Sequence, residues 1–210
     1  MEIKILGEVE SYDNLLSSIP QIINRIETIC KNSDLVYSHM VIEGREVYDD
    51  PETYLQENIA DLNRVEIVLK TIQEMMGEMM ESAVDYLDRA NAEINNLAEE
   101  FYNGPTEETW LHFQQLLDGM SWLLETTNLL EKTYRELSGR STDFQEKLDE
   151  LKEALEGKDL ILVGDILKYE LVPFLEKLNL DLSMILQEKD DTHDLVYLPP
   201  RLGLFLPKPL

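Results

Sequence analysis

Basic residues are scarce in this sequence. Among 210 residues, 18 lysines and arginines stand against 43 aspartates and glutamates, which gives a formal net charge of -25 at pH 7. A surface this negative repels the phosphate backbones of nucleic acids and the anionic surface of membranes. We therefore expect neither nucleic acid nor a membrane among the partners. The acids are expected to form the solvated faces of helices, which leaves a basic protein partner possible in electrostatic terms.

Cysteine is nearly absent too, because Cys30 is the only one. A single cysteine excludes an intrachain disulfide and a zinc site built from cysteines, and it agrees with a reducing compartment. The chain has no run approaching 18 apolar residues, and its first ten residues, MEIKILGEVE, lack the features of a signal peptide. We therefore expect a cytoplasmic protein without a transmembrane helix.

The motifs of common enzymes are also missing. The sequence contains neither a Gly-x-Ser-x-Gly nucleophile motif nor a glycine-rich phosphate loop. Glu108 and His112 are four residues apart and share a helix face that a metal could use, but there is no second such pair, so we interpret them as part of an ordinary polar face. We assign no catalytic, cofactor-binding or metal-binding residue, and we expect no cofactor.

The first 70 residues alternate between strand and helix patterns. Strands are predicted at Glu2 to Val9 and Arg64 to Leu69, and a hairpin with a tight Glu43-Gly44 turn at 35–48. Helices are predicted from about Ser11 to Asn32, with Pro20 either a kink or in the first turn, and from Pro51 to about Ile59. The order β-α-β-β-α-β predicts a small ferredoxin-like α+β module at residues 1–70.

Long amphipathic stripes follow, and they predict an antiparallel bundle of about four helices over residues 71–189. The first helix covers Thr71 to Phe101, and the second runs from Thr106 to about Leu137. A third is centred on 144–155. The fourth begins after Asp159, and Pro173 is expected to kink it by removing one backbone hydrogen bond.

The fourth helix carries polar residues among its apolar ones. Asp165 and Tyr169 are four residues apart, so they share a helix face. We leave two interpretations open. The pair could form a polar patch for a partner, or it could form hydrogen bonds to a neighbouring helix that fix the register between them.

The last segment, residues 190–210, changes character. From Leu195 onward it contains four prolines and no acid, and Arg201 and Lys208 are its only charged residues. Prolines exclude a helix, while the many apolar side chains argue against simple disorder. We expect this tail either to bind along its own domain or to enter a groove on another molecule. Its candidate contact residues are Tyr197, Leu202, Leu204 and Phe205.

One set of residues in the helical region combines aromatic, acidic and small side chains: Trp110, Phe113, Gly119, Trp122-Leu123, Asp159, Val163, Asp165, Tyr169-Glu170-Leu171 and Pro173. Together they resemble an uncharacterised helical domain family of bacteria. Ile42-Glu43-Gly44 and Val65-Glu66-Ile67 are similar to what precedes that domain in some members. The resemblance implies a bacterial cytoplasmic helical domain, and it implies no activity or site residues.

The leading functional hypothesis is a non-enzymatic interaction or scaffold protein that uses the bundle and the apolar tail to bind another protein or itself, in the second case as a homodimer. The candidate contact residues are Asp165 and Tyr169 together with the four in the tail. The alternative is a bundle that binds a small molecule or a metal near Asp165, Tyr169, Glu108 and His112, with an enzymatic role in that case.

Overall fold

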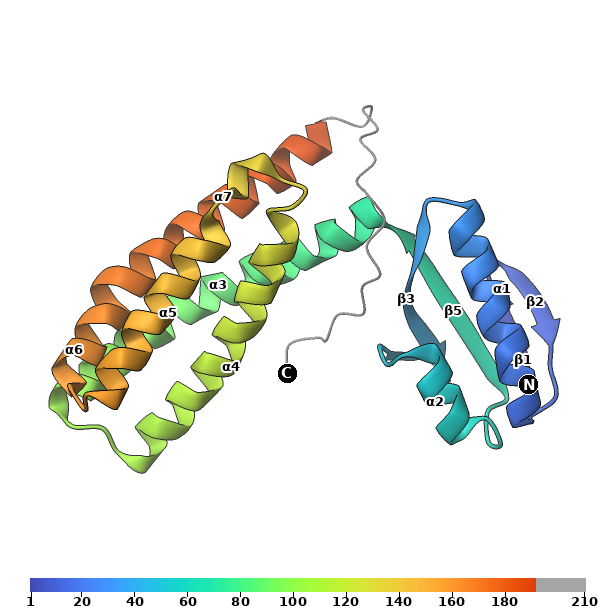
Figure 1. Ribbon diagram of the computed structural model, residues 1–210, viewed down its shortest axis with the longest axis horizontal. Coiled ribbons are helices and arrows are strands. Elements are labelled where there is room, and N and C mark those ends of the chain that lie inside the picture. The colour runs from blue at the N-terminus through green and yellow to red at the C-terminus, as the bar shows by residue number, and fades with distance from the viewer. Residues whose placement is uncertain (192–210) are drawn as a thin grey trace. The chain divides into compact units, whose positions relative to one another are not determined.

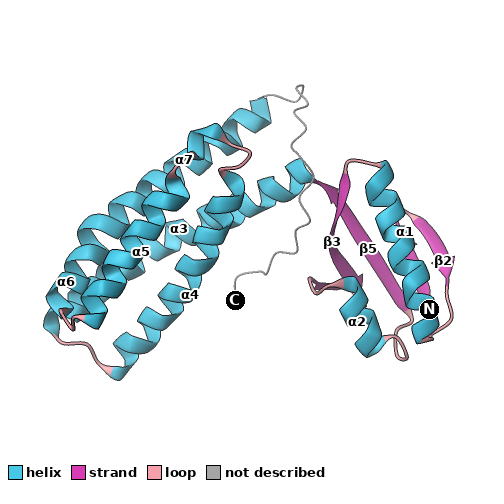
Figure 2. Ribbon diagram, in the orientation of Figure 1, coloured by secondary structure: helices cyan, strands magenta, loops and turns pink. Residues whose placement is uncertain are grey.

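The structure is a computed structural model, and it describes residues 1–191. The chain divides into two compact units, of which the first is Met1–Met76 and the second begins at Gly77. A five-stranded sheet and several helices make up the described chain, so the expected α+β class is confirmed (Figures 1 and 2). Of the predicted tail, only the first two residues are described, and they end the last helix.

The first unit is a mixed sheet with two helices. Its elements are β1 (Glu2–Ile5), β2 (Glu8–Ser11), α1 (Ile19–Asn32), β3 (Leu35–Ile42), β4 (Arg45–Val47), α2 (Pro51–Asn58) and β5 (Arg64–Thr71). The strand order in the sheet is β2-β1-β5-β3-β4. Strands β1 and β5 pair in parallel, and the other neighbouring strands pair antiparallel.

The ferredoxin-like order is not confirmed, because the expected strand at Glu2 to Val9 is a hairpin. Leu6 and Gly7 adopt φ angles of 49° and 87°, the positive values of a two-residue type I′ turn. The turn reverses the phase of the alternation, because Ile5 pairs with Glu8 and Lys4 pairs with Val9, which moves Val9 to the face opposite Ile5. Leucine is not a typical first residue of such a turn, so the sequence pattern alone reads as one strand. The hairpin of β3 and β4 does have its expected turn at Glu43-Gly44.

Helix α1 begins later than expected, at Ile19, after a short 3-10 turn at Leu16–Ser18. Pro20 therefore lies in the first turn, where its missing N–H costs no helical hydrogen bond. Helix α2 has Pro51 at its start, and the carboxylate of Asp50 accepts a hydrogen bond from the Thr53 N–H at 2.8 Å. Both helices thus begin with a proline in the first turn, and α2 also has a side-chain cap.

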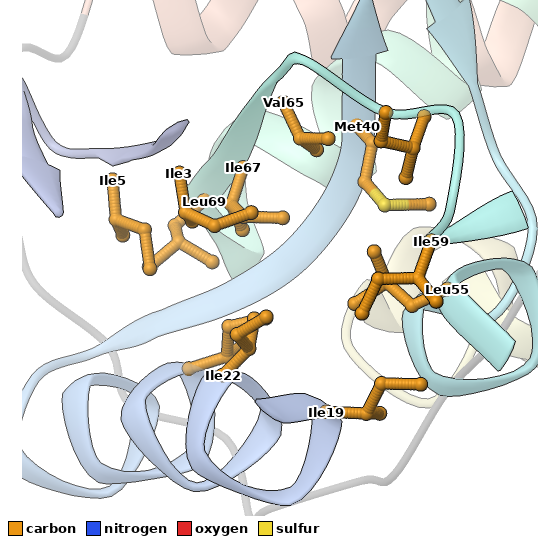
Figure 3. Packing of buried hydrophobic residues seen from close by; sticks show 12 residues of the cluster. Ile3, Ile5, Ile19, Ile22, Met40, Leu55, Ile59, Val65, Ile67 and Leu69 are labelled. Atoms are coloured by element: carbon orange, nitrogen blue, oxygen red, sulfur yellow. The ribbon is translucent and has the colours of Figure 1, made fainter. Parts of the chain in front are cut away.

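The core of the first unit lies between one face of the sheet and the two helices. Side chains from α1, α2 and three strands meet there (Figure 3). The fully or nearly fully buried members include Ile3, Ile22, Met40, Leu55 and Val65. Because β-branched residues pack well on a pleated surface, this isoleucine-rich face suits a sheet covered by helices.

The second unit is helical. Its elements are α3 (Ile72–Asn103), α4 (Glu107–Leu130), a 3-10 turn η2 (Arg135–Leu137), α5 (Arg140–Glu156), α6 (Leu160–Asp165), a π-helical segment η3 (Ile166–Leu171) and α7 (Val172–Asp191). Thr106 caps α4 through a reciprocal pair of hydrogen bonds with Thr109, and Asp159 caps α6. Within residues 1–191, none of the helices has both the length and the apolar character that crossing a membrane requires.

The second bundle helix was expected to reach Leu137, but α4 ends at Leu130. The N–H groups of Thr133 and Tyr134 both donate to the Leu130 carbonyl oxygen, which closes the helix there. Leu137 still reaches the core, where it is fully buried, because the η2 turn carries it inward. The apolar spacing therefore continues past the true end of the helix.

Helix α3 runs antiparallel to the segment formed by α6, η3 and α7. Three hydrogen bonds join them: Tyr102 to Asp165 at 2.7 Å, Lys168 to Glu99 at 2.6 Å and Asn179 to Asp88 at 2.7 Å. Residue numbers fall along α3 as they rise along its neighbour, which defines the antiparallel direction. These bonds fix the register between the two segments.

Candidate functional site

The most unusual backbone of the second unit is the π-helical segment Ile166–Leu171, which connects α6 to α7 without a break. Here the Val172 N–H donates to the Leu167 carbonyl oxygen, five residues earlier. Pro173 follows directly and has no N–H to donate to the preceding turn. Sequence reasoning placed an irregularity at Pro173, and the structure shows a widened turn just before it. π-segments of this kind are frequent at functional sites.

The sequence contained a signal for this wide turn. Four buried residues in and beside this segment are each four apart: Val163, Leu167, Leu171 and Leu175. An ordinary helix alternates steps of three and four to keep one face buried, whereas a wider turn needs four residues. The repeated step of four is therefore typical of a π insertion.

Asp165 is the first predicted contact residue, and it joins two helices. Its Oδ1 accepts the hydrogen bond from the Tyr102 hydroxyl of α3. Next to it, buried Gly164 lies against the Tyr102 ring, and a Cβ on this glycine would be only 2.6 Å from a ring carbon. The interpretation of Asp165 as part of an interhelical hydrogen-bond network is thus supported by its geometry.

Tyr169, the second predicted contact residue, points to solvent and is 62% exposed. The ammonium group of Lys168 lies 5.7 Å from the centroid of its ring and 6.0 Å from that of Tyr102, within cation-π range. A hydrogen bond to Glu99 raises the pKa of Lys168. Asp165 and Tyr169 thus have different roles, since one connects helices and the other presents an aromatic ring.

An open cleft of about 760 Å³ lies between α5 and the start of the next helix. Its lining combines acidic and apolar residues: Glu150, Glu153, Ala154, Gly157, Asp159, Leu162, Asp165, Ile166, Tyr169 and Glu170. The structure therefore brings Asp165 and Tyr169 together at one cleft. Neither Glu108 nor His112 belongs to this lining, and both are exposed on α4.

Lys147 partly neutralises the negative charge of the carboxylates that line the cleft. The Lys147 ammonium lies 2.8 Å from Glu170 and 3.8 Å from Glu150, and the hydrogen bond to Glu170 raises the pKa of Lys147. Within residues 1–191, no group of three or more His, Cys, Asp or Glu side chains is arranged to hold a metal ion. The arrangement can attract a cation, and its apolar residues can contact a neighbouring chain.

Beyond the cleft, apolar side chains follow the solvent side of the same helix. Tyr169, Pro173, Leu180 and Met184 are spaced by four, seven and four residues, so they lie along one side of it. We call these four residues the outer stripe. Leu180 is 65% exposed and Met184 is 59% exposed. Sequence reasoning missed Leu180 and Met184, although this second apolar spacing beside the buried one was visible.

The four candidate contact residues of the tail, Tyr197, Leu202, Leu204 and Phe205, lie outside the described residues. Their role therefore stays a prediction from sequence. The other two candidates, Asp165 and Tyr169, are the ones that the structure places in a defined setting.

Comparison with protein families finds a match within the helical unit. Residues 78–181 match a family model described as a domain of unknown function, DUF8042. The segment similar to this family spans 104 of the 210 residues. The prediction of an uncharacterised domain family is thus confirmed, and the DUF8042 segment contains the cleft, the π-helical turn and most of the outer stripe. The comparisons with curated proteins and with solved structures gave no match.

We expect stability to fall at alkaline pH because several tyrosines are held in surroundings that disfavour ionisation. Burial raises the pKa of Tyr86 and of Tyr134 to about 12, with nearby Glu93 and Glu136 as smaller causes. The folded state thus keeps these protons more tightly than the unfolded chain, in which tyrosine ionises near pH 10. This stabilisation is complete below about pH 10 and is lost as the pH rises to about 12.

The measurement is thermal unfolding of the native chain and of the variant Tyr86→Phe/Tyr134→Phe between pH 8 and about 11.5, the range in which tyrosines ionise. The variant should lose less stability over the alkaline part of this range, because it lacks two of the ionising groups. Equal losses in the two proteins would contradict the prediction.

Proposed function

We propose that this protein is a non-enzymatic interaction module that contacts another protein, or a second copy of itself, through the helical unit. The observation that carries the proposal is the outer stripe, whose large apolar residues remain exposed on the DUF8042 segment and its immediate continuation. Single exposed apolar residues are common on protein surfaces, but a row on one helix face is typical of a surface that packs against a partner.

The proposal treats α3, α4, α5 and the continuous segment from α6 to α7 as an antiparallel bundle of about four helices. The three hydrogen bonds between α3 and that segment support this arrangement. A rigid bundle lets the outer stripe keep its spacing before a partner binds, which lowers the entropy cost of binding. Asp165 joins this segment to α3 through the Tyr102 hydroxyl, and Tyr169 offers an amphipathic ring of the kind enriched at interfaces.

We include the tail at 190–210 in the proposal, on the ground of its sequence, as a segment that packs either against its own chain or against a partner. It is apolar and free of acids from Leu195 onward, in contrast to the acidic chain. We place this function in the cytoplasm of a bacterium on the basis of the sequence resemblance and the single cysteine.

The test compares the native chain with Leu180→Glu/Met184→Glu and with a control, Leu111→Glu on α4. All three positions are more than half exposed, so none of these changes should unfold the protein. Light scattering measures self-association, and a pull-down from the native cell extract measures other partners. We expect the double variant to lose self-association or its partner at least tenfold, and the control to retain it. Equal binding by all three proteins would contradict the proposal.

A second candidate function is recognition of a small cation in the cleft. Its volume falls within the range of small-molecule sites, and its carboxylates come from both of the helices that border it. Equilibrium dialysis of the native chain and of Glu153→Gln against small organic cations distinguishes this function. Binding that Glu153→Gln weakens, while Leu180→Glu/Met184→Glu leaves it unchanged, would favour the small-molecule function.

A further inference from the structure

The five-stranded sheet has a second face, opposite the core of the first unit. Strand pairing defines it: Lys4 is opposite Val9 and Glu66, His39 is opposite Val68, and Val41 is opposite Glu66. Because side chains alternate along a strand, these residues point away from Ile3, Met40, Val65 and Ile67, which contact α1 and α2. We call this second face the outer face.

The outer face has an apolar centre. Val36, His39 and Val41 follow one another along β3 on this side, and Val68 of β5 lies beside His39. The His39 ring stacks on Tyr48 at a centroid distance of 4.8 Å and is only 5% exposed. The three valines are outside the core cluster formed with α1 and α2. A purely solvated sheet face would carry polar residues at such positions.

The charges at the border of the outer face balance one another. Lys4 and Glu66 form an ion pair at 2.8 Å across β1 and β5. The chain as a whole carries a net charge of -25, so a locally neutral apolar surface is unusual in this protein. An apolar segment can cover such a surface without burying an unpaired charge.

The described chain ends at Asp191, the last residue of α7, and 19 residues follow it in the sequence.

We propose that residues 195–210 bind the outer face of the sheet in their own chain and cover Val36, Val41 and Val68. The chemistry of the segment matches this face: it is rich in leucine and proline and has no acid, and its only charges are Arg201 and Lys208. Residues 192–210 extend up to about 60 Å at 3.3 Å per residue, which is more than the length of any strand here. Covering both faces completes a layered arrangement around the sheet.

Trypsin tests this in the full chain, because the only bond after residue 191 that it cuts readily follows Arg201, since Lys208 precedes a proline. We compare the native chain with Val41→Thr/Val68→Thr, which keeps side-chain shape and strand propensity while making the outer face polar. The control is Leu180→Thr/Met184→Thr on the outer stripe. We expect the first variant to be cut after Arg201 at least tenfold faster than the native chain, and the control to be cut at the native rate.

Equal cleavage rates in all three proteins would overturn the proposal. Faster cleavage of the control alone would also overturn it, because the segment would then lie on the helical unit. Photo-crosslinking from benzoylphenylalanine at Val36 provides a second measurement that does not depend on the stability of the variant. Crosslinks to residues 195–210 within one chain would support the proposal, and crosslinks between isotopically distinct chains would overturn it.

Discussion

Replacing Phe144 with alanine is expected to lower the free energy of unfolding of the helical unit by about 3–5 kcal/mol, the range for a buried phenylalanine. Phe144 is fully buried on α5, and its ring stacks on Phe174 of α7 with a centroid distance of 5.1 Å. Alanine would remove the ring and leave a cavity between the two helices, whose walls would lose dispersion contacts on one side.

Urea unfolding followed by circular dichroism measures this change. A matched control is Leu180→Ala on α7, which removes an exposed side chain and should change the free energy of unfolding by less than about 0.5 kcal/mol. If Phe144→Ala lowers the free energy of unfolding by less than about 1 kcal/mol, the packing described here is contradicted, because a cavity of this size in a rigid core destabilises a protein by more than that.

The second large effect concerns two helical glycines that should respond to the same substitution with opposite signs. Gly77→Ala in α3 should stabilise the protein by up to about 1 kcal/mol, because alanine is the better helix former and its Cβ would meet nothing within 4 Å. Gly164→Ala should instead destabilise it by about 1–3 kcal/mol, since the new Cβ would overlap the Tyr102 ring.

A double-mutant cycle can show whether the destabilisation by Gly164→Ala comes from the contact with the Tyr102 ring or from a change in helix propensity. If the Tyr102 ring is the obstacle, Tyr102→Ala should remove most of the penalty of Gly164→Ala, because the two changes concern one contact. Thermal unfolding of the two single variants and of the double variant measures the three changes in the free energy of unfolding that the cycle compares. Additive effects would show that the penalty has another origin. A shift of the hydroxyl away from Asp165 would also weaken one of the three bonds that set the helix register.

These two predictions bear on the proposed function because they concern the support of the surface rather than the surface itself. Phe144 packs behind α7, which carries most of the outer stripe, and Gly164 lets Tyr102 of α3 approach the start of the π-helical turn. If the outer stripe binds a partner, Gly164→Ala should weaken binding at temperatures where the protein is still folded. The exposed variants at Leu180 and Met184 should weaken binding without a change in stability.

The sequence alone determined the α+β class, the helices and several of their ends. Thr106 and Asp159 were expected to begin helices, and both accept hydrogen bonds from backbone N–H groups at those points. The Glu43-Gly44 turn was predicted for the same kind of reason, because a glycine readily adopts the positive φ that it requires. Such features depend on a few neighbouring residues, so local chemistry is sufficient to predict them.

Tertiary structure decided the features that depend on residues far apart in the chain. Alternation alone did not reveal the β1–β2 hairpin, in which strand pairing places Val9 on the face of Lys4, opposite Ile3 and Ile5. The sequence also left Asp165 open between a partner patch and a helix contact. The hydroxyl of Tyr102, 63 residues away, supports the helix contact, while Tyr169 on the same helix stays exposed. Sequence spacing specifies which residues share a face, and only packing between distant segments determines what that face contacts.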